Sequence, residues 1–163
     1  MVNTPYTLNR FITALTGFAQ NHSQINSFGF GDGFDIGSRD CLYNENLTVG
    51  KITYGAMWCI PQPSVTTRRL LQHRFSILFM DRVNTEQDNL NDVLSDQLEI
   101  LRDFCAWMVN EFSHIDDFNI DNNYSFPIMP FTEFTDDAVA GYKLDVTVQF
   151  INLNDYCAVP QKD

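Results

Sequence analysis

The stretch NTEQDNLNDVLSDQLEILRDFCAWMVNEFSH, residues 84–114, is the strongest structural signal in the chain and predicts one long helix over residues 86–114. Asn84 and Thr85 are good N-cap residues, and the acidic Glu86 suits the first turn of a helix. Trp107 and Val109 lie outside the centre of the apolar stripe, which predicts that a sheet and a second subunit both cover the last turns. The stripe consists of Leu90, Val93, Leu94, Leu98, Leu101, Phe104, Cys105, Met108, Phe112 and Ile115.

Two segments with strand-like alternation precede this helix. Residues 51–60 alternate cleanly and are followed by Pro61 and Pro63, which are expected to end the strand. Residues 68–82 form a second long strand, and the short link predicts an antiparallel hairpin. One face of this strand carries His73, Phe75, Ile77 and Phe79, and the other carries Arg74, Ser76, Leu78 and Met80.

Two further strands are expected after the helix. Residues 116–123 read as a polar turn, and residues 124–134 are interrupted by proline, which is typical of an edge or bulged strand. Residues 141–152 form a strong strand, and residues 153–163 an extended tail. In the strong strand Leu144, Val146, Val148 and Phe150 alternate with Asp145, Thr147 and Gln149.

The N-terminal part combines a helix with an unusual connection. Residues 6–21 show one apolar stripe at helical spacing. Residues 23–50 mix glycine with phenylalanine and predict a long loop or irregular strand with aromatic anchors, of the kind that carries contacts to partners. The whole chain, residues 1–163, is therefore expected to be one structural domain of the α+β class, a mainly antiparallel sheet with two helices packed on one face.

Composition limits the classes of function. Hydrophobic residues make up 44% of the 163 residues, which is enough for a real core, and the formal net charge is −11. Such an acidic surface disfavours tight binding of phosphate groups. The four cysteines, Cys41, Cys59, Cys105 and Cys157, are too far apart for a metal knuckle, so we expect reduced and mostly buried thiols. No signal peptide or membrane-spanning run is recognisable, which favours production in a reducing cytoplasm and no membrane partner.

Two segments imitate ligand-binding loops without completing them. Residues 117–121 have the pattern Asp-x-Asn-x-Asp of a calcium loop, but Asn122 replaces the turn glycine and Ile128 stands where the closing glutamate belongs. Residues 29–33, Gly-Phe-Gly-Asp-Gly, lack both the last glycine of a dinucleotide-binding loop and the Lys-Ser/Thr of a P-loop. We expect no metal and no cofactor.

Residues able to act in catalysis are scattered, and we expect no enzyme. An alternative hydrolase reading would use Asp136, Asp137 and His114, although a turn or cap role suits the two aspartates better. The basic residues Arg68, Arg69 and Arg74 are too few for strong nucleic-acid binding and could instead pair with an acidic neighbouring subunit. His22, His73, Ser64 and Ser95 likewise lack the context of a base or a nucleophile.

Several phrases of the sequence resemble a family of structural proteins encoded by phages of Bacteroidetes, including crAss-like phages. They are INSFGFGD (25–32), LFMDRV (78–83), VLSDQL (93–98), DDAVAGY (136–142) and CAVP (157–160), and the resemblance covers about residues 10–160. The order helix, two strands, helix, two strands is similar to the tail-terminator fold of tailed bacteriophages. The family offers no catalytic residues to carry over.

The resemblance implies a virion structural protein at the neck or tail, assembled in the cytoplasm of the bacterial host. Such proteins form closed rings that join portal to tail, and the expected partners are copies of the chain and other neck, portal or tail proteins. DNA would pass through the negative lumen without specific binding. Exposed aromatic residues in long segments suggest subunit contacts at Phe28, Phe30, Phe34, Ile36, Tyr156 and Val159.

Two other possibilities remain open from the sequence. The phenylalanines of residues 23–50 could equally fill the core of the domain itself. The chain could also be an assembly factor outside the virion, or a soluble binding module that stays monomeric. Presence in mature particles separates these functions from a ring subunit.

Overall fold

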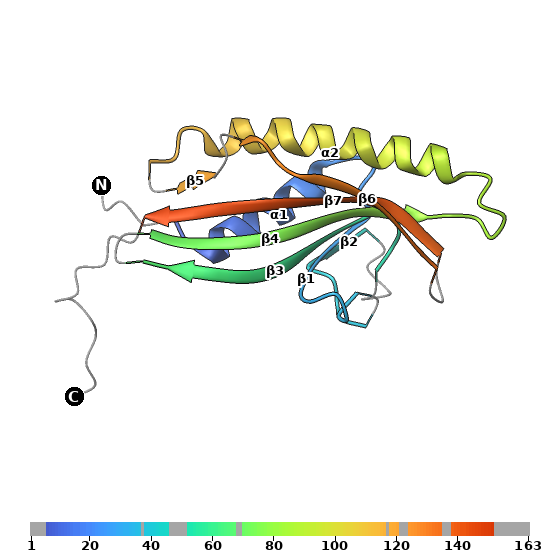
Figure 1. Ribbon diagram of the computed structural model, residues 1–163, viewed down its shortest axis with the longest axis horizontal. Coiled ribbons are helices and arrows are strands. Elements are labelled where there is room, and N and C mark those ends of the chain that lie inside the picture. Colours follow the sequence, from blue (N-terminus) through green and yellow to red (C-terminus); the bar gives the residue numbers. More distant parts are fainter. Residues whose placement is uncertain are drawn as a thin grey trace.

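The computed structural model describes residues 6–36, 38–45, 52–67, 70–116, 118–120, 124–134 and 138–151, and it confirms the α+β class. In chain order the elements are α1 (Leu8–Asn21), β1 (Ser27–Phe30), β2 (Tyr43–Asn44), β3 (Ala56–Thr66), β4 (Leu70–Arg82), α2 (Leu90–Phe112), β5 (Phe118–Ile120), β6 (Ile128–Phe134) and β7 (Ala138–Ile151) (Figure 1).

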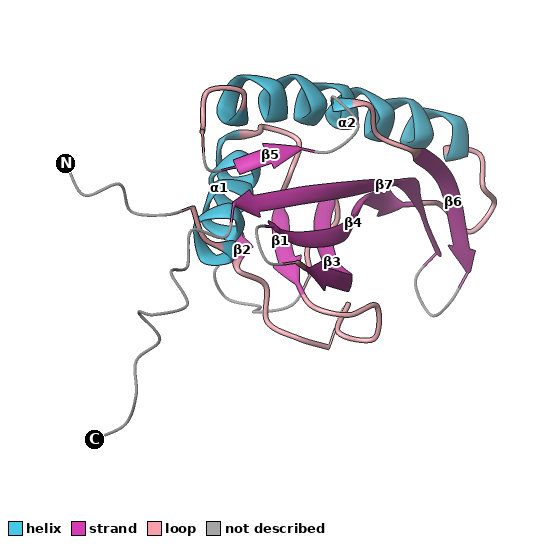
Figure 2. Ribbon diagram, turned by 60° about the vertical axis from the view of Figure 1, so that its left-hand side comes forward, coloured by secondary structure: helices cyan, strands magenta, loops and turns pink. Residues whose placement is uncertain are grey.

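The described strands form one sheet in the order β2-β1-β3-β4-β7-β5, with β6 also paired to β7. Every pairing is antiparallel except that of β1 with β3. The longest one joins β4 to β7, from Leu70 opposite Ile151 to Arg82 opposite Val139. On its other edge β7 pairs first with β6 and then with β5, and the sheet curls strongly along this edge (Figure 2).

One face of the sheet forms the main core together with both helices. Because side chains alternate along a strand, β4 and β7 each present a continuous apolar row to this side. The sheet residues of this core are Phe28, Met57, Cys59, Phe75, Ile77, Phe79, Phe118, Ile120, Leu144, Val146, Val148 and Phe150. The helix residues are Phe11, Leu15, Phe18 and Ala19 from α1, and Ile100, Leu101, Phe104, Met108 and Phe112 from α2.

Aromatic contacts connect the helices to each other and to the sheet. The ring of Phe18 in α1 lies 5.2 Å from that of Phe104 in α2, centroid to centroid. Phe104 in turn lies 5.3 Å from Phe79 of β4, and Phe11 lies 5.2 Å from Phe75 of the same strand. These distances are typical of favourable aromatic pairs, each of which adds about 0.5–1.5 kcal/mol beyond simple burial.

A second, smaller core lies on the opposite face of the sheet. Trp58, Ala56 and Met80 are buried there, and Ile36 and Cys41 pack against them from the segment that follows β1. The Trp58 Nε1–H donates a hydrogen bond of 3.2 Å to the Gly31 carbonyl. Strand β3 is therefore buried on both faces near its start. This explains why both sets of alternating residues in its sequence are apolar there.

The described part of segment 23–50 contains short strands as well as loops. It contains β1, which pairs in parallel with β3 from Ser27 opposite Ala56 to Phe30 opposite Cys59, and the short β2. Four residues give too little alternation to reveal a strand whose partner lies far along the chain. Residues 118–120, assigned to a polar turn, similarly form β5, which buries Phe118 and Ile120.

Strand β3 starts at Ala56 and runs to Thr66 through Pro61 and Pro63, which were expected to end it. Because the pairing with β1 stops at Phe30 opposite Cys59, the rest of β3 is an edge within the described residues. The two prolines are two positions apart, so both nitrogens can face this edge and remove no hydrogen bond to β4.

Helix α2 begins at Leu90, later than predicted, because residues 84–89 form a hydrogen-bonded turn. The Asn84 N–H donates to Asn89 Oδ1 at 2.8 Å, and the Gln87 N–H donates to the Asn84 carbonyl at 2.8 Å. Side-chain hydrogen bonds of this kind compete with the helix at its start.

We predict opposite effects of adding a methyl group at two glycines. A Cβ at Gly29 would overlap the buried aromatic ring of Trp58, whereas nothing lies within 4 Å of a Cβ at Gly17 in α1. Gly29→Ala should lower the free energy of unfolding by about 1–3 kcal/mol. Gly17→Ala should raise it by about 0.5–1 kcal/mol. Urea unfolding measures both, and a Gly29→Ala protein as stable as the wild type would refute the packing described here.

Candidate functional site: exposed surfaces for protein contact

The exposed residue Phe34 stands on a tightly hydrogen-bonded turn, here called the Phe34 turn (residues 31–36 and 38–39). Asp32 Oδ1 accepts the N–H groups of Phe34 and Asp35 at 2.9 and 3.1 Å. Asp35 Oδ2 accepts the Asp32 N–H at 3.0 Å and Arg39 Nη1 at 3.2 Å. The backbone around Phe34 is thus fixed, while its side chain is 93% exposed.

The structure separates the residues predicted to form subunit contacts. Phe28 is fully buried in the main core, which fits the alternative that this phenylalanine fills the core of the domain itself. Phe30 is half-buried against the same core, and Ile36 packs against the Trp58 cluster. Phe34 is exposed, and Tyr156 and Val159 lie outside the described residues.

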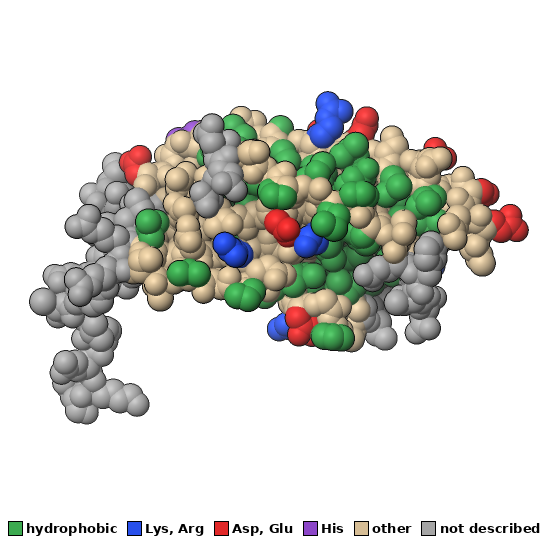
Figure 3. Space-filling model, viewed as in Figure 1, with side chains coloured by type: hydrophobic (Ala, Val, Ile, Leu, Met, Phe, Trp, Pro, Cys, Tyr) green, Lys and Arg blue, Asp and Glu red, His purple; other side chains and the backbone are tan. Residues whose placement is uncertain are grey.

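The face of the sheet opposite the helices is open where β3, β4 and β7 run beyond the Trp58 cluster. The strand register places Arg74 opposite Thr147, Ser76 opposite Asp145 and Met129 opposite Lys143 on this side. Figure 3 views the molecule from this side and shows few charged groups over the sheet. We call this surface the open sheet face; it consists of Gln62, Val65, Arg74, Ser76, Met129, Lys143, Asp145 and Thr147.

A shallow hollow of about 550 Å³ lies in the open sheet face between Arg74 and Lys143. In its floor the Ser76 hydroxyl donates a 2.6 Å hydrogen bond to Asp145. Lys143 Nζ lies 3.4 Å from the other oxygen of Asp145, whereas Arg74 has no acidic partner among the described residues. Within the described part of the chain, the hollow therefore offers one positive charge that no carboxylate compensates.

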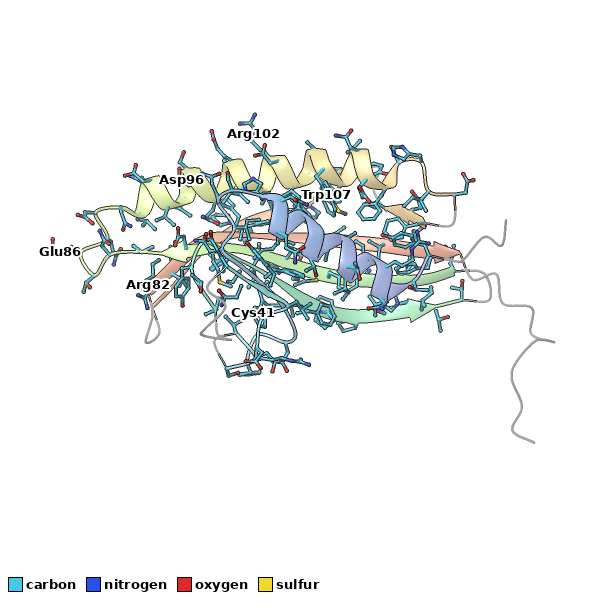
Figure 4. All side chains as sticks on the ribbon, turned by 180° about the vertical axis from the view of Figure 1, so that it is seen from behind. Cys41, Arg82, Glu86, Asp96, Arg102 and Trp107 are labelled. Carbon is cyan, nitrogen blue, oxygen red and sulfur yellow. The ribbon has the colours of Figure 1, made fainter. Side chains whose placement is uncertain are left out.

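Exposed acidic residues gather on the outer side of α2. Asp92, Asp96, Glu99 and Asp103 follow one another at spacings of four, three and four positions, which places them along one line of the helix surface. We call these four residues the acidic ridge. Asp103 Oδ2 lies 3.3 Å from His22 Nε2 at the end of α1. Figure 4 shows Asp96 and Arg102 on the side of α2 that points away from the sheet.

A groove of about 400 Å³ separates α1 from α2 near the C-terminal end of each helix. Phe18 and Trp107 form its apolar floor, with their ring centroids 4.9 Å apart, and Gly17 leaves it open on the α1 side. Trp107, which the sequence placed outside the main stripe, is thus half-buried by α1 of the same chain.

The thiols and the calcium-like segment do not form a reactive centre. Burial raises the pKa of Cys41, Cys59 and Cys105, so these thiols stay protonated near neutral pH. Asn119 lies in β5, while Asp117 and Asp121 lie outside the described residues. Within the described ranges no three His, Cys, Asp or Glu side chains come together as a metal site would require.

The sequence did not reveal the contact between Ser64 and His73, which the β3–β4 hairpin brings together. Ser64 Oγ lies 3.0 Å from His73 Nδ1. A nucleophile and base need a third group that orients the base, yet the His73 ring packs on Phe75 and Phe150 instead of on a carboxylate among the described residues. The pair is best understood as a cross-strand contact.

The remaining catalytic candidates stay apart or undescribed. Arg68, Arg69, Asp136 and Asp137 lie outside the described residues, and His114 is exposed after the end of α2. Ser95 is exposed on α2.

Comparison with known proteins adds no relative. No protein-family model matches the chain, and no curated protein matches it. In the part of the chain that the structure describes, neither helix has the length and apolar character needed to span a membrane.

The contrast between Phe28 and Phe34 can be measured directly. Phe28→Ala should cost about 3–5 kcal/mol of unfolding free energy because it leaves a cavity in the core. Phe34→Ala should change it by less than about 0.5 kcal/mol because the side chain is exposed. Chemical unfolding of the two variants checks this, and similar losses in both would contradict the burial described above.

We also predict that His73 makes the stability depend on pH. Desolvation lowers the pKa of His73 in the folded state. As the pH falls through about 6.5, the unfolded chain binds a proton at this histidine more readily than the folded one does, so stability decreases. His73→Gln should weaken this decrease between about pH 7 and pH 5, whereas Ser64→Ala should retain it. Equal pH dependence in the wild type and His73→Gln would rule out the effect.

Proposed function

We propose that this chain is a virion structural protein that forms a closed ring in the neck or tail of a tailed phage, joins portal to tail and lets DNA pass. The observation that carries the proposal is Phe34, held 93% exposed on its hydrogen-bonded turn. Leaving a phenylalanine in water forgoes about 1.5–3 kcal/mol of burial, and a fixed backbone prepares it for a partner.

The distribution of exposed surfaces supports contacts between copies that use two different patches. The Phe34 turn follows β1, whereas the exposed Met129 belongs to β6, on the far side of β7 in the strand order. A contact that joins two unlike patches repeats in the same direction from copy to copy, and such a repeat closes into a ring when the rotation allows it.

The charge of the chain fits passage of DNA. The formal net charge of the chain is −11, so its surface as a whole is acidic. DNA binding requires clusters of Lys or Arg, and an acidic lumen would repel the phosphate backbone. Together with the resemblance of the sequence phrases to phage structural proteins, this favours a passive conduit over a DNA-binding protein.

Quantitative mass spectrometry of purified particles tests the proposal. Particles of the phage that encodes the chain should contain it in a fixed ratio to the other neck and tail proteins. Particles without it would overturn the proposal and favour an assembly factor.

The contribution of Phe34 can be tested in the same particles. Phe34→Asp should strongly reduce incorporation of the chain while leaving its unfolding free energy nearly unchanged, because the side chain is exposed in the monomer. Phe34→Leu keeps an apolar group and serves as the control that should still be incorporated. Normal incorporation of Phe34→Asp would show that this turn is not a subunit contact.

A further inference from the structure

The charges of the domain are divided between its two sides. Exposed acids form the ridge on α2, on the helix side of the sheet. Of the lysines and arginines in the described ranges, Arg74 and Lys143 lie together on the open sheet face. Lys143 forms an ion pair with Asp145, whereas Arg74 has no acidic partner among the described residues. The open sheet face is therefore locally positive, although the protein as a whole is strongly acidic.

Apolar groups accompany these two cations. Val65 is 52% exposed and Met129 is 61% exposed, and the strand register places both on the open sheet face. Val65 lies near Arg74 and Met129 near Lys143, so a partner that pairs with the two cations would also bury apolar area, which stabilises a contact.

The spacing of the charges on the two surfaces is similar. From Asp92 to Asp103 the acidic ridge extends over roughly 16 Å, at about 1.5 Å per helical residue. On the open sheet face Arg74 is opposite Thr147, four positions along β7 from Lys143. This corresponds to roughly 13 Å at about 3.3 Å per strand residue.

We propose that the open sheet face of one copy binds the acidic ridge of α2 of the next copy. The contact would bring carboxylates of the ridge to Arg74 and Lys143, with Val65 and Met129 beside them. The ridge and the open sheet face point to opposite sides of the domain, so the contact is head to tail and repeats. This inference rests on the proposed ring function and identifies a surface through which the copies would meet.

The chemistry favours a second copy over nucleic acid at this face. The phosphate backbone of DNA would meet only two cations at this face, and one of them, Lys143, is already paired with Asp145. The net charge of −11 would further disfavour DNA binding. A second copy, in contrast, supplies carboxylates at matching spacing and relieves the exposure of Val65 and Met129.

Charge reversal in pairs tests the contact. The sheet variant carries Arg74→Glu and Lys143→Glu, and the ridge variant carries Asp96→Lys and Glu99→Lys. In either variant alone, the contact would bring groups of like charge together. Sedimentation equilibrium at low salt should therefore show self-association weaker than that of the wild type by roughly tenfold or more. Mixed in equal amounts, the variants pair opposite charges at both kinds of contact and should associate again. This recovery would also show that both variants are folded.

Glu86→Lys is the matched control, because this exposed acid lies in the turn before α2, outside the acidic ridge. It should associate like the wild type. A wild-type chain that stays monomeric at every concentration, or a mixture that does not recover association, overturns the contact. So does a sheet variant that loses affinity for labelled duplex DNA while still self-associating, which would mark a nucleic-acid surface.

The outcome is separable from that of the proposed function. If the chain is present in particles but the mixture does not recover, the ring function stands and this contact fails. If the mixture recovers but particles lack the chain, the copies use this contact outside the virion and the ring function fails.

Discussion

The pairing of β4 with β7 is the constraint on which the rest of the molecule depends. Its register, from Leu70 opposite Ile151 to Arg82 opposite Val139, aligns the apolar rows of the two strands on the side of the helices. A shift of β7 by one residue against β4 would turn Val146 outward and bring Thr147 into the core opposite Phe75. The same register sets Arg74 and Lys143 on the open sheet face. The register of this one strand pair therefore determines both the core on one face of the sheet and the candidate interaction surface on the other.

Sequence patterns predicted the parts of the fold that rest on long, regular alternation. The rows of β4 and β7 and most of α2 extend over enough residues for their periods to be clear. The short strands β1, β2 and β5 were missed because their stability comes from pairing with distant segments rather than from local pattern. The prediction that Pro61 and Pro63 end the strand failed because a proline ends a central strand but is tolerated in an edge strand. The order of the strands in the sheet, which the sequence does not show, decides which case applies.

The candidate surfaces were predictable only in part. Phe28 and Phe34 were both predicted as subunit contacts, and nothing in the sequence distinguished the exposed Phe34 from Phe28, which β1 turns into the core. The sequence placed Arg74 on the face of its strand away from Phe75. That Lys143 and Met129 lie on the same face of the sheet follows only from the pairing of β7 with β4 and of β6 with β7. The spacing of the four acidic residues on α2 can be seen in the sequence. That a positive, partly apolar sheet face lies on the other side of the domain, as a possible partner for them, can be seen only in the structure.

Cryo-electron microscopy of the intact virion tests the ring assignment most directly. The assignment predicts a closed ring of this chain between portal and tail, with Phe34 against a neighbouring subunit and an acidic surface toward the DNA. A neck and tail built without this chain would contradict it.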